Sequence, residues 1–204
     1  MPKTQINVLP PRVSPLLPTE GDAIVNYKSL RLQARTALSV IQVLAFANQY
    51  EAAAAAIEKS LKIECPLKPG ACNADEHTQV AWNGPNSWLI IASDEAAKRK
   101  PGQLLKSLKK AVDKLGAVVD QSHGRCCIRL SGKHARRVMA KNTSIDLHPI
   151  SFGPGQCALT AVAHMSALVI QVDDAPSYDL FVARSLARSF THAIEYACRE
   201  FAED

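Results

Sequence analysis

The sequence predicts an α+β fold made of two related halves. Short apolar runs with the two-residue period of strands alternate with longer segments that have the period of amphipathic helices. The first half follows the order β-α-β-β-α-β, which is the split-βαβ, ferredoxin-like arrangement. In WNGPNSWLII and again in VDDAPSYDLFV, a turn with proline joins two apolar strands and a helix follows. This repeat indicates two halves of the βαββα type.

Residues 1–25 are predicted to be a Pro-rich N-terminal arm. Prolines stand at positions 2, 10, 11, 15 and 18, and proline removes the backbone donor that helices and central strands need. We expect the arm either to be disordered or to lie across a partner.

Residues 26–120 form the first predicted half, βαββαβ. LRLQART (30–36) and SVIQVLAF (39–46) have strand character. A helix follows, for which Asn48 is the expected cap and Glu51 completes a capping box before an alanine run. CPLKPGACNADE (65–76) contains two prolines and a glycine, which predict a loop.

The rest of this half is a hairpin, a helix and a strand. NGPN (83–86) suits a tight turn between two apolar strands. In residues 101–116, Pro101 suits a helix start and Gly116 a helix stop, with leucines on one face and lysines on another. AVVD (117–120) is expected to be a buried strand.

Residues 121–204 form the second predicted half, βαβββα. An apolar run before a basic, amphipathic segment predicts a strand and a short helix, and three more apolar runs precede a second amphipathic helix. The expected elements are a strand at 126–132, a helix at 133–142, a loop at 143–156, three strands starting at CALTAVAH, ALVIQV and YDLFVARS, and a helix at 185–201.

The composition is that of an ordinary folded protein, with 47% hydrophobic and 21% charged residues. A net charge of +5 is mild, and aromatic residues make up only 5%, so nucleic-acid binding is not favoured. No apolar run reaches the length of a membrane span and no signal-peptide pattern is present, so we expect a cytoplasmic protein.

The six cysteines are predicted to be reduced and to act as small apolar residues. Cys126 and Cys127 are neighbours in a strand-like run, where side chains point to opposite faces. Cys65, Cys72 and His77 lack the close pair of thiolates with which structural zinc sites usually begin.

Histidines near cysteines suggest a nucleophile. His123 is near Cys126 and Cys127, and His134 or His148 could approach Cys157. Thiols in apolar runs tend to have a raised pKa, which opposes activation. For His148, which precedes Pro149, a hydrogen-bonded loop position is the favoured interpretation.

Two further features have weaker functional interpretations. FGPGQC (152–157) is rich in glycine but precedes a strand, whereas phosphate loops precede a helix, so we expect a turn. The basic residues are KRK (98–100), the lysines of the helix at 101–116, and Lys133, Arg136 and Arg137; most are expected to be solvated. We therefore predict no catalytic, cofactor-binding or metal-binding residue.

A series of short motifs in residues 118–157 carries a family resemblance. They are Asp120, Ser122, Gly124 and Arg125; Arg129 to Gly132; His134 to Arg136; Ala140 and Lys141; Asp146 to Pro149; and Phe152, Pro154, Gly155 and Cys157. Together with WNGPNSWL they resemble the gamma subunit of heterotetrameric sarcosine oxidase. Asn86 and Ser87 depart from an acidic pair, and Lys133 and Asn142 from a common proline and glycine.

The resemblance implies an α-β-γ-δ complex that oxidatively demethylates sarcosine to glycine, forms hydrogen peroxide and transfers the one-carbon unit to tetrahydrofolate. FAD, FMN, NAD and zinc would be held by other subunits, and this chain would hold no cofactor. It also implies a fold like that of the folate-binding glycine-cleavage T protein. The chain would be a non-catalytic assembly subunit with most contact to the alpha subunit, in contact with no nucleic acid or membrane.

Two alternatives stay open. An equivalent subunit could serve a complex that acts on another N-methyl amino acid, such as N-methylglutamate. A stand-alone folate-binding protein would need an acidic residue for the pterin, for which Asp120 and Asp146 are the candidates. For a contact surface, the Pro-rich arm and the low-charge stretch SFGPGQCALTAV (151–162) are the expected segments.

Overall fold

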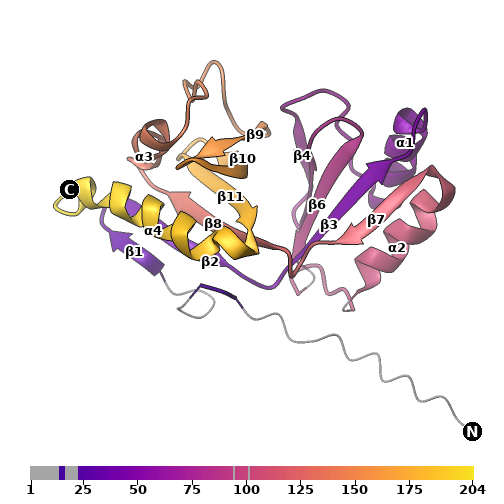
Figure 1. The fold of residues 1–204 in the computed structure, drawn as a ribbon, viewed down its shortest axis with the longest axis horizontal. Helices are drawn as coiled ribbons and strands as arrows, with labels where there is room; N and C mark the ends of the chain where they lie inside the picture. Colours follow the sequence, from indigo (N-terminus) through magenta and orange to yellow (C-terminus); the bar gives the residue numbers. More distant parts are fainter. Residues whose placement is uncertain (1–13, 17–22, 94, 101) are drawn as a thin grey trace, which may run out of the picture.

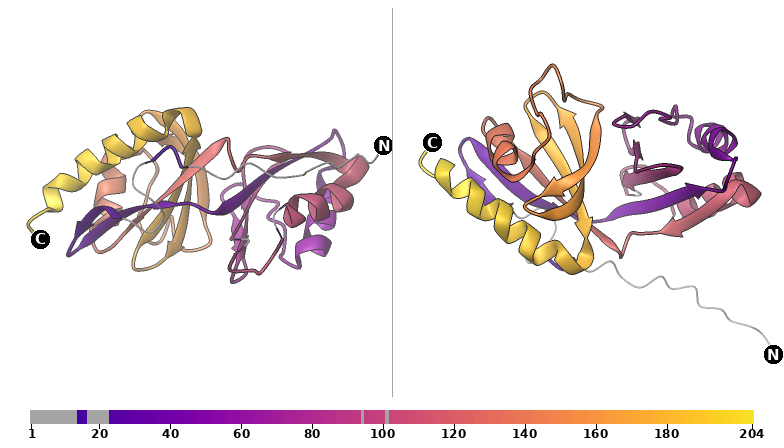
Figure 2. Two further views of the ribbon diagram at one scale, coloured as in Figure 1. Left: turned by 90° about the horizontal axis from the view of Figure 1, so that it is seen from below. Right: turned by 45° about the horizontal axis from the view of Figure 1, so that its top comes forward.

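The protein consists of two antiparallel sheets that pack against each other, with helices on the outer faces (Figures 1 and 2). The computed structural model describes residues 14–16, 23–93, 95–100 and 102–204. None of the described helices is long and apolar enough to cross a membrane.

The first sheet has six strands in the order β1-β2-β8-β11-β10-β9. Helices α3 (Ala135–Asn142) and α4 (Ala187–Cys198) cover its outer face. The strands are β1 (Ala23–Tyr27), β2 (Leu30–Arg35), β8 (Arg125–Ser131), β11 (Ser177–Ala183), β10 (Met165–Asp173) and β9 (Cys157–Val162).

The second sheet has five strands in the order β4-β5-β6-β3-β7. Helices α1 (Tyr50–Leu61) and α2 (Gln103–Val112) cover its outer face. The strands are β4 (Cys72–Ala74), β5 (Thr78–Trp82), β6 (Ser87–Ser93), β3 (Leu38–Ala45) and β7 (Gly116–Asp120). The order β5-β6-β3-β7 is the one expected of a split-βαβ unit, which confirms that part of the predicted fold.

Three apolar clusters hold these four layers together. One lies between the six-stranded sheet and α3 and α4, and another between the five-stranded sheet and α1 and α2. The third lies between the two sheets, where Leu89 and Ile91 of β6 meet residues such as Phe181 of β11. The inner faces of both sheets are therefore core where they overlap.

The helices form where the predicted periodicity places them. In α2, Leu104, Leu108 and Val112 are buried at a spacing of four residues, while the lysines lie on the other side. In α4, Phe190, Ile194 and Cys198 are buried at the same spacing. Short 3₁₀ turns at 113–115, 184–186 and 199–201 extend the helical segments.

Several predicted boundaries were wrong. Asn48 does not cap α1, because it adopts a left-handed conformation with φ of 62° and the residue before the helix is Gln49, which makes no side-chain cap. Residues 72–74 form β4 within the predicted loop. Gly116 begins β7. The expected helix start, Pro101, lies outside the described residues.

The predicted division between the halves differs from the division between the sheets. Residues 23–25 were assigned to the arm, yet they begin β1. Strands β1 and β2, most of which fall in the first predicted half, join the six-stranded sheet because β2 pairs with β8 from Arg31↔Ser131 to Arg35↔Cys127. Such pairing between distant segments leaves no trace in local periodicity.

Candidate functional site

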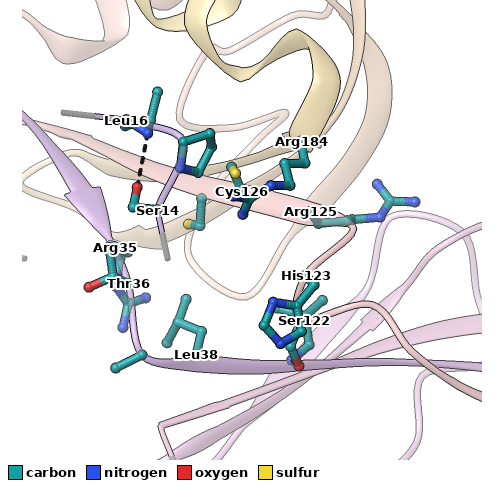
Figure 3. Close-up of a pocket in the computed structure, with 14 residues that line it drawn as sticks. Ser14, Leu16, Arg35, Thr36, Leu38, Ser122, His123, Arg125, Cys126 and Arg184 are labelled. Atoms are coloured by element: carbon teal, nitrogen blue, oxygen red, sulfur yellow. Dashed lines mark hydrogen bonds between the residues drawn. The ribbon is translucent and has the colours of Figure 1, made fainter. Parts of the chain in front are cut away.

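A pocket opens where the two sheets meet, at the junction of four chain segments (Figure 3). Ser122 and His123 lie near Leu38, while Cys126 and Arg184 lie farther up toward the six-stranded sheet. The pocket is lined by the β2–β3 connection, the turn between β7 and β8 with the start of β8, Arg184 just after β11, and residues 14–16 of the arm.

The turn between β7 and β8 is held by its own polar groups. Asp120 Oδ1 accepts a hydrogen bond from the Ser122 backbone N–H at 2.9 Å. Ser122 Oγ in turn accepts one from the Val40 N–H on β3 at 3.0 Å. The Arg184 N–H donates to the Gly124 carbonyl at 2.9 Å. The motif from Asp120 to Arg125 thus ties the end of one sheet to the start of the other.

His123 lies in the same pocket as Cys126 and Cys127, as their closeness in sequence suggested. Burial raises the pKa of the Cys126 thiol, which Arg184 partly opposes. Burial raises the pKa of Cys127 still further. Within the described residues no hydrogen bond links the His123 imidazole to either thiol. Both cysteines are therefore protonated at neutral pH and neither is a nucleophile in this state.

Residues 14–16 of the arm close one side of this pocket. Leu16 is only 6% exposed and belongs to the core beneath α4. Arg188 Nε donates a hydrogen bond to the Pro15 carbonyl at 3.3 Å. This part of the arm therefore packs on the chain itself, and residues 1–13 and 17–22 lie outside the described residues.

A buried ion cluster stands beside the pocket, on three neighbouring strands. Asp179 of β11 is fully buried. Arg129 of β8 binds it through Nε at 2.7 Å and Nη2 at 2.8 Å, and Arg35 of β2 binds it through Nη1 at 2.6 Å. The two arginines compensate the cost of burying the carboxylate.

This cluster was not predicted from the sequence, although two apolar strands each contain a charged residue. Asp179 interrupts the otherwise apolar strand SYDLFVA, and Arg129 interrupts CCIRLS. A charged residue in a strand that is buried on both faces must find a partner of opposite charge. The pattern could have predicted a pair, but not that Arg35 would complete it.

A second junction joins the loop before β4 to the loop before β9. The Cys157 N–H donates to the Gly70 carbonyl at 2.8 Å, and the Cys72 N–H donates to the Gly155 carbonyl at 2.9 Å. Burial raises the pKa of Cys157 to about 11 and that of Cys72 to about 12. The segment 152–157 is thus a turn that leads into β9, as expected, and it holds the two sheets together.

The candidate metal ligands do not converge. Cys65 lies in the core between the five-stranded sheet and its helices, whereas Cys72 lies between the two sheets. His77 is near Glu76 at 3.9 Å. Across the described ranges, no group of three or more His, Cys, Asp or Glu side chains could hold a metal ion. All six cysteines are free and buried, as predicted.

His134 and His148 have structural positions. The His134 ring stacks on Phe201 at 4.6 Å, and its Nε2 is 3.3 Å from a carboxylate oxygen of Asp204. His148 Nδ1 accepts a hydrogen bond from the Ile150 N–H at 3.3 Å, which confirms its interpretation as a loop residue. Asp146 accepts bonds from the His148 N–H at 2.9 Å and the Ser151 hydroxyl at 2.6 Å, which lower its pKa.

The basic residues do not form one surface. Helix α2, with its lysines, and helix α3, with Arg136 and Arg137, lie at opposite ends of the molecule (Figure 1). Arg99 Nη2 donates to Thr78 Oγ1 at 2.9 Å, and Arg137 is 3.5 Å from Glu200. Taken together, the junction side chains are arranged to hold two sheets in register.

Comparison with known proteins gives consistent results. The model of the "Sarcosine oxidase, gamma subunit family" matches residues 47–200. The chain is 31% identical over 149 residues to a sarcosine oxidase subunit gamma from Arthrobacter sp., covering 69% of this chain and 71% of the relative. It is also 31% identical over 152 residues to one from Corynebacterium sp. (strain P-1), covering 74% and 71%.

Two solved structures are similar as well. A chain of the heterotetrameric sarcosine oxidase from Corynebacterium sp. U-96, in complex with pyrrole 2-carboxylate, matches with a TM-score of 0.76 and 25% identity, covering 89% of this chain and 90% of that one. The glycine cleavage system aminomethyltransferase T from Bartonella henselae matches with a TM-score of 0.57 and 10% identity, covering 82% of this chain and 46% of that one. The second match shows shared fold alone, and this likeness was expected.

Proposed function

The chain belongs to the sarcosine oxidase gamma subunit family, and from this premise we propose that it is the gamma subunit of a heterotetrameric sarcosine oxidase. The observation that carries the proposal is the match of the family model over residues 47–200, together with a fold that matches a chain of a heterotetrameric enzyme over 89% of its length. The chain would assemble with alpha, beta and delta subunits.

The complex would catalyse the oxidative demethylation of sarcosine. Sarcosine loses two electrons, which reduce oxygen to hydrogen peroxide, and its methyl carbon passes to tetrahydrofolate as a methylene group, which leaves glycine. FAD, FMN, NAD and zinc would be bound in other subunits. This chain would contribute packing, mainly against the alpha subunit.

We further propose that no side chain of this subunit takes part in the chemistry. The pKa values of the buried thiols support this view: burial raises those of Cys65, Cys72 and Cys198 to about 12. A thiol with such a pKa supplies almost no thiolate at neutral pH.

Coexpression of the four subunits tests the assembly. The tagged chain is expected to retain the other three subunits, to be yellow from flavin and to oxidise sarcosine. A chain that elutes alone as a stable monomer would contradict the proposal. In the same complex, His123→Ala and Cys157→Ala should leave kcat/KM for sarcosine within about twofold of wild type. A loss of several hundredfold with full assembly would assign chemistry to this subunit.

Substrate assays and calorimetry separate the alternatives. A higher kcat/KM for N-methylglutamate than for sarcosine would identify a related complex. A stand-alone folate-binding protein is less well supported, because Asp120 and Asp146 already accept hydrogen bonds within their own turns. Tight binding of tetrahydrofolate to the isolated chain, measured by calorimetry, would support a stand-alone folate-binding protein.

A further inference from the structure

Strand β9 is an edge strand without the protection that such strands usually have. The two sheets have four edges, which are β1 and β9 in one and β4 and β7 in the other. Edge strands in soluble proteins are normally guarded by charged residues or proline, because their free backbone groups can pair with another chain.

Three of the four edges carry nearby charges. Lys28 follows β1, Asp75 and Glu76 follow β4, and β7 ends at Asp120. By contrast, residues 147–172 contain no Asp, Glu, Lys or Arg, in a chain of which 21% is charged. Absence of charge is expected for β10, which is central, but it is not expected for β9.

The backbone of β9 offers a short free edge. The Cys157 N–H points away from β10, since it donates to Gly70, and so do the polar groups of Leu159 and Ala161, because direction alternates along a strand. The edge is closed before this segment by the pairing of Ala71 with Gln156 and after it by that of Thr143 with Val162. Among the described residues, the open backbone groups therefore run from the Cys157 carbonyl, past Leu159, to the Ala161 N–H.

Exposed apolar side chains lie on this edge and in the loop that precedes it. Leu159 pairs with Leu168, which is buried between the sheets, yet Leu159 itself is 46% exposed. Ile150 is 90% exposed at a turn that Asp146, His148 and Ser151 hold in place. Ile150 and Leu159 are thus two exposed apolar side chains in one charge-free segment, and a partner that covered them would bury apolar area.

We propose that the β9 edge binds an extended, uncharged segment of another subunit of the complex by strand addition. The partner strand would hydrogen-bond to the backbone of Leu159 and Ala161, extend the six-stranded sheet and cover the Leu159 side chain. Ile150 would contact the same subunit. This inference rests on the proposed function, since it requires a complex, and it assigns the subunit interface to a definite strand.

A lysine on the edge tests the proposal in the coexpressed four-subunit complex. Leu159→Lys should reduce the amount of partner subunits retained by the tagged chain by about tenfold or more, because the charge would be buried. Val119→Lys is the matched control, since Val119 is 41% exposed on β7, the free edge of the other sheet. It should retain its partners at the wild-type level.

The outcomes distinguish the two proposals. If the wild-type chain retains no partner, the proposed function fails and the edge is irrelevant. If the wild type retains its partners and Leu159→Lys does so equally well, the β9 interface is wrong while the function stands. Equal losses from Leu159→Lys and Val119→Lys would also overturn it.

Hydrogen exchange within the assembled complex tests strand addition itself. The outward amides of Leu159 and Ala161 should exchange as slowly as the amide of Thr160, which faces β10. Fast exchange at Leu159 and Ala161 in the intact complex would exclude a paired strand at this edge.

Discussion

The junction between the two sheets and the β9 edge differ in almost every respect. At the junction, polar side chains have partners within the chain, as Ser122 has the Val40 N–H and Asp179 has two arginines. Along β9, backbone groups and the Leu159 side chain face outward. His123 lies at the junction with Cys126 and Cys127, whereas the only cysteine of the β9 edge is the buried Cys157.

The motifs of residues 120–125 form hydrogen bonds between the two sheets, so a dense set of motifs can have a structural role. Turns that pass between sheets require particular residues, such as Asp120 and Ser122, because buried backbone groups need acceptors and donors. An edge that binds a partner needs only apolar side chains and an absence of charge. In this chain the motif-rich junction holds the two sheets together, whereas the less conspicuous β9 edge is the segment that we propose to bind a partner.

Removal of the buried carboxylate should have the largest effect. Asp179→Ala leaves the Arg35 and Arg129 guanidinium groups facing each other without a counter-charge, and we expect the free energy of unfolding to fall by about 3–5 kcal/mol. Urea denaturation measures this change. The control is Asp174→Ala, which changes an exposed residue near the same strand. If both substitutions lowered the free energy of unfolding by similar amounts, the buried ion cluster would be no more important for stability than an exposed residue.

Two serine substitutions compare the junction with the turn before β9. Ser122→Ala leaves the Val40 N–H without its acceptor and should lower the free energy of unfolding by about 1–3 kcal/mol. Ser151→Ala removes an exposed hydroxyl from the turn before β9 and should cost less than about 1 kcal/mol. Thermal unfolding of the two variants gives the order, and a reversed order would contradict the proposed role of the junction.

The buried thiols make stability depend on alkaline pH. Burial raises the folded-state pKa of Cys72 to about 12, above the value of about 8.5 in an unfolded chain. Between these values the unfolded state has lost a proton that the folded state keeps, so the free energy of unfolding falls as pH rises from about 9 toward 12. Urea titrations at several pH values should show a shallower fall for Cys72→Ala, and no such change for Leu159→Ala.

The smallest effect is expected at the turn beside the edge. Ile150→Ser alters a side chain that is 90% exposed, so the free energy of unfolding of the free chain should change by less than about 0.5 kcal/mol. The same variant should weaken retention of partner subunits in the complex. A clear loss of stability with unaltered assembly would place Ile150 within the fold and remove it from the interface.

Prediction from sequence succeeded where structure depends on near neighbours. The spacing of Leu104, Leu108 and Val112 predicts helix α2, and the turn at 83–86 predicts the hairpin of β5 and β6, because helix and hairpin contacts are local. It failed for β1, a short edge strand with an irregular burial pattern and a bulge between Ala23 and Val25. It also failed for the cap at Asn48, whose backbone conformation is set by the turn before the helix.

The candidate site could likewise be predicted only in part. Closeness in sequence made His123 with Cys126 or Cys127 a candidate nucleophile that the apolar context did not favour, and the three residues lie in one pocket. The apolar context predicted that the pKa of those thiols would be raised, as it is. The partners of Asp179 could not be predicted, because Arg35, Arg129 and Asp179 lie far apart in the chain and meet only when β2, β8 and β11 align.

The α+β class, the helices and hairpins, the free cysteines and the family could be predicted from the sequence. These depend on local periodicity, apolar context and the order of short motifs. The tertiary structure was needed to see that β1 and β2 join the six-stranded sheet, that Asp179 is neutralised by two arginines, and that β9 is an edge strand. Strand pairing at long separation is selected by the total burial of the assembled sheets, which no short segment encodes.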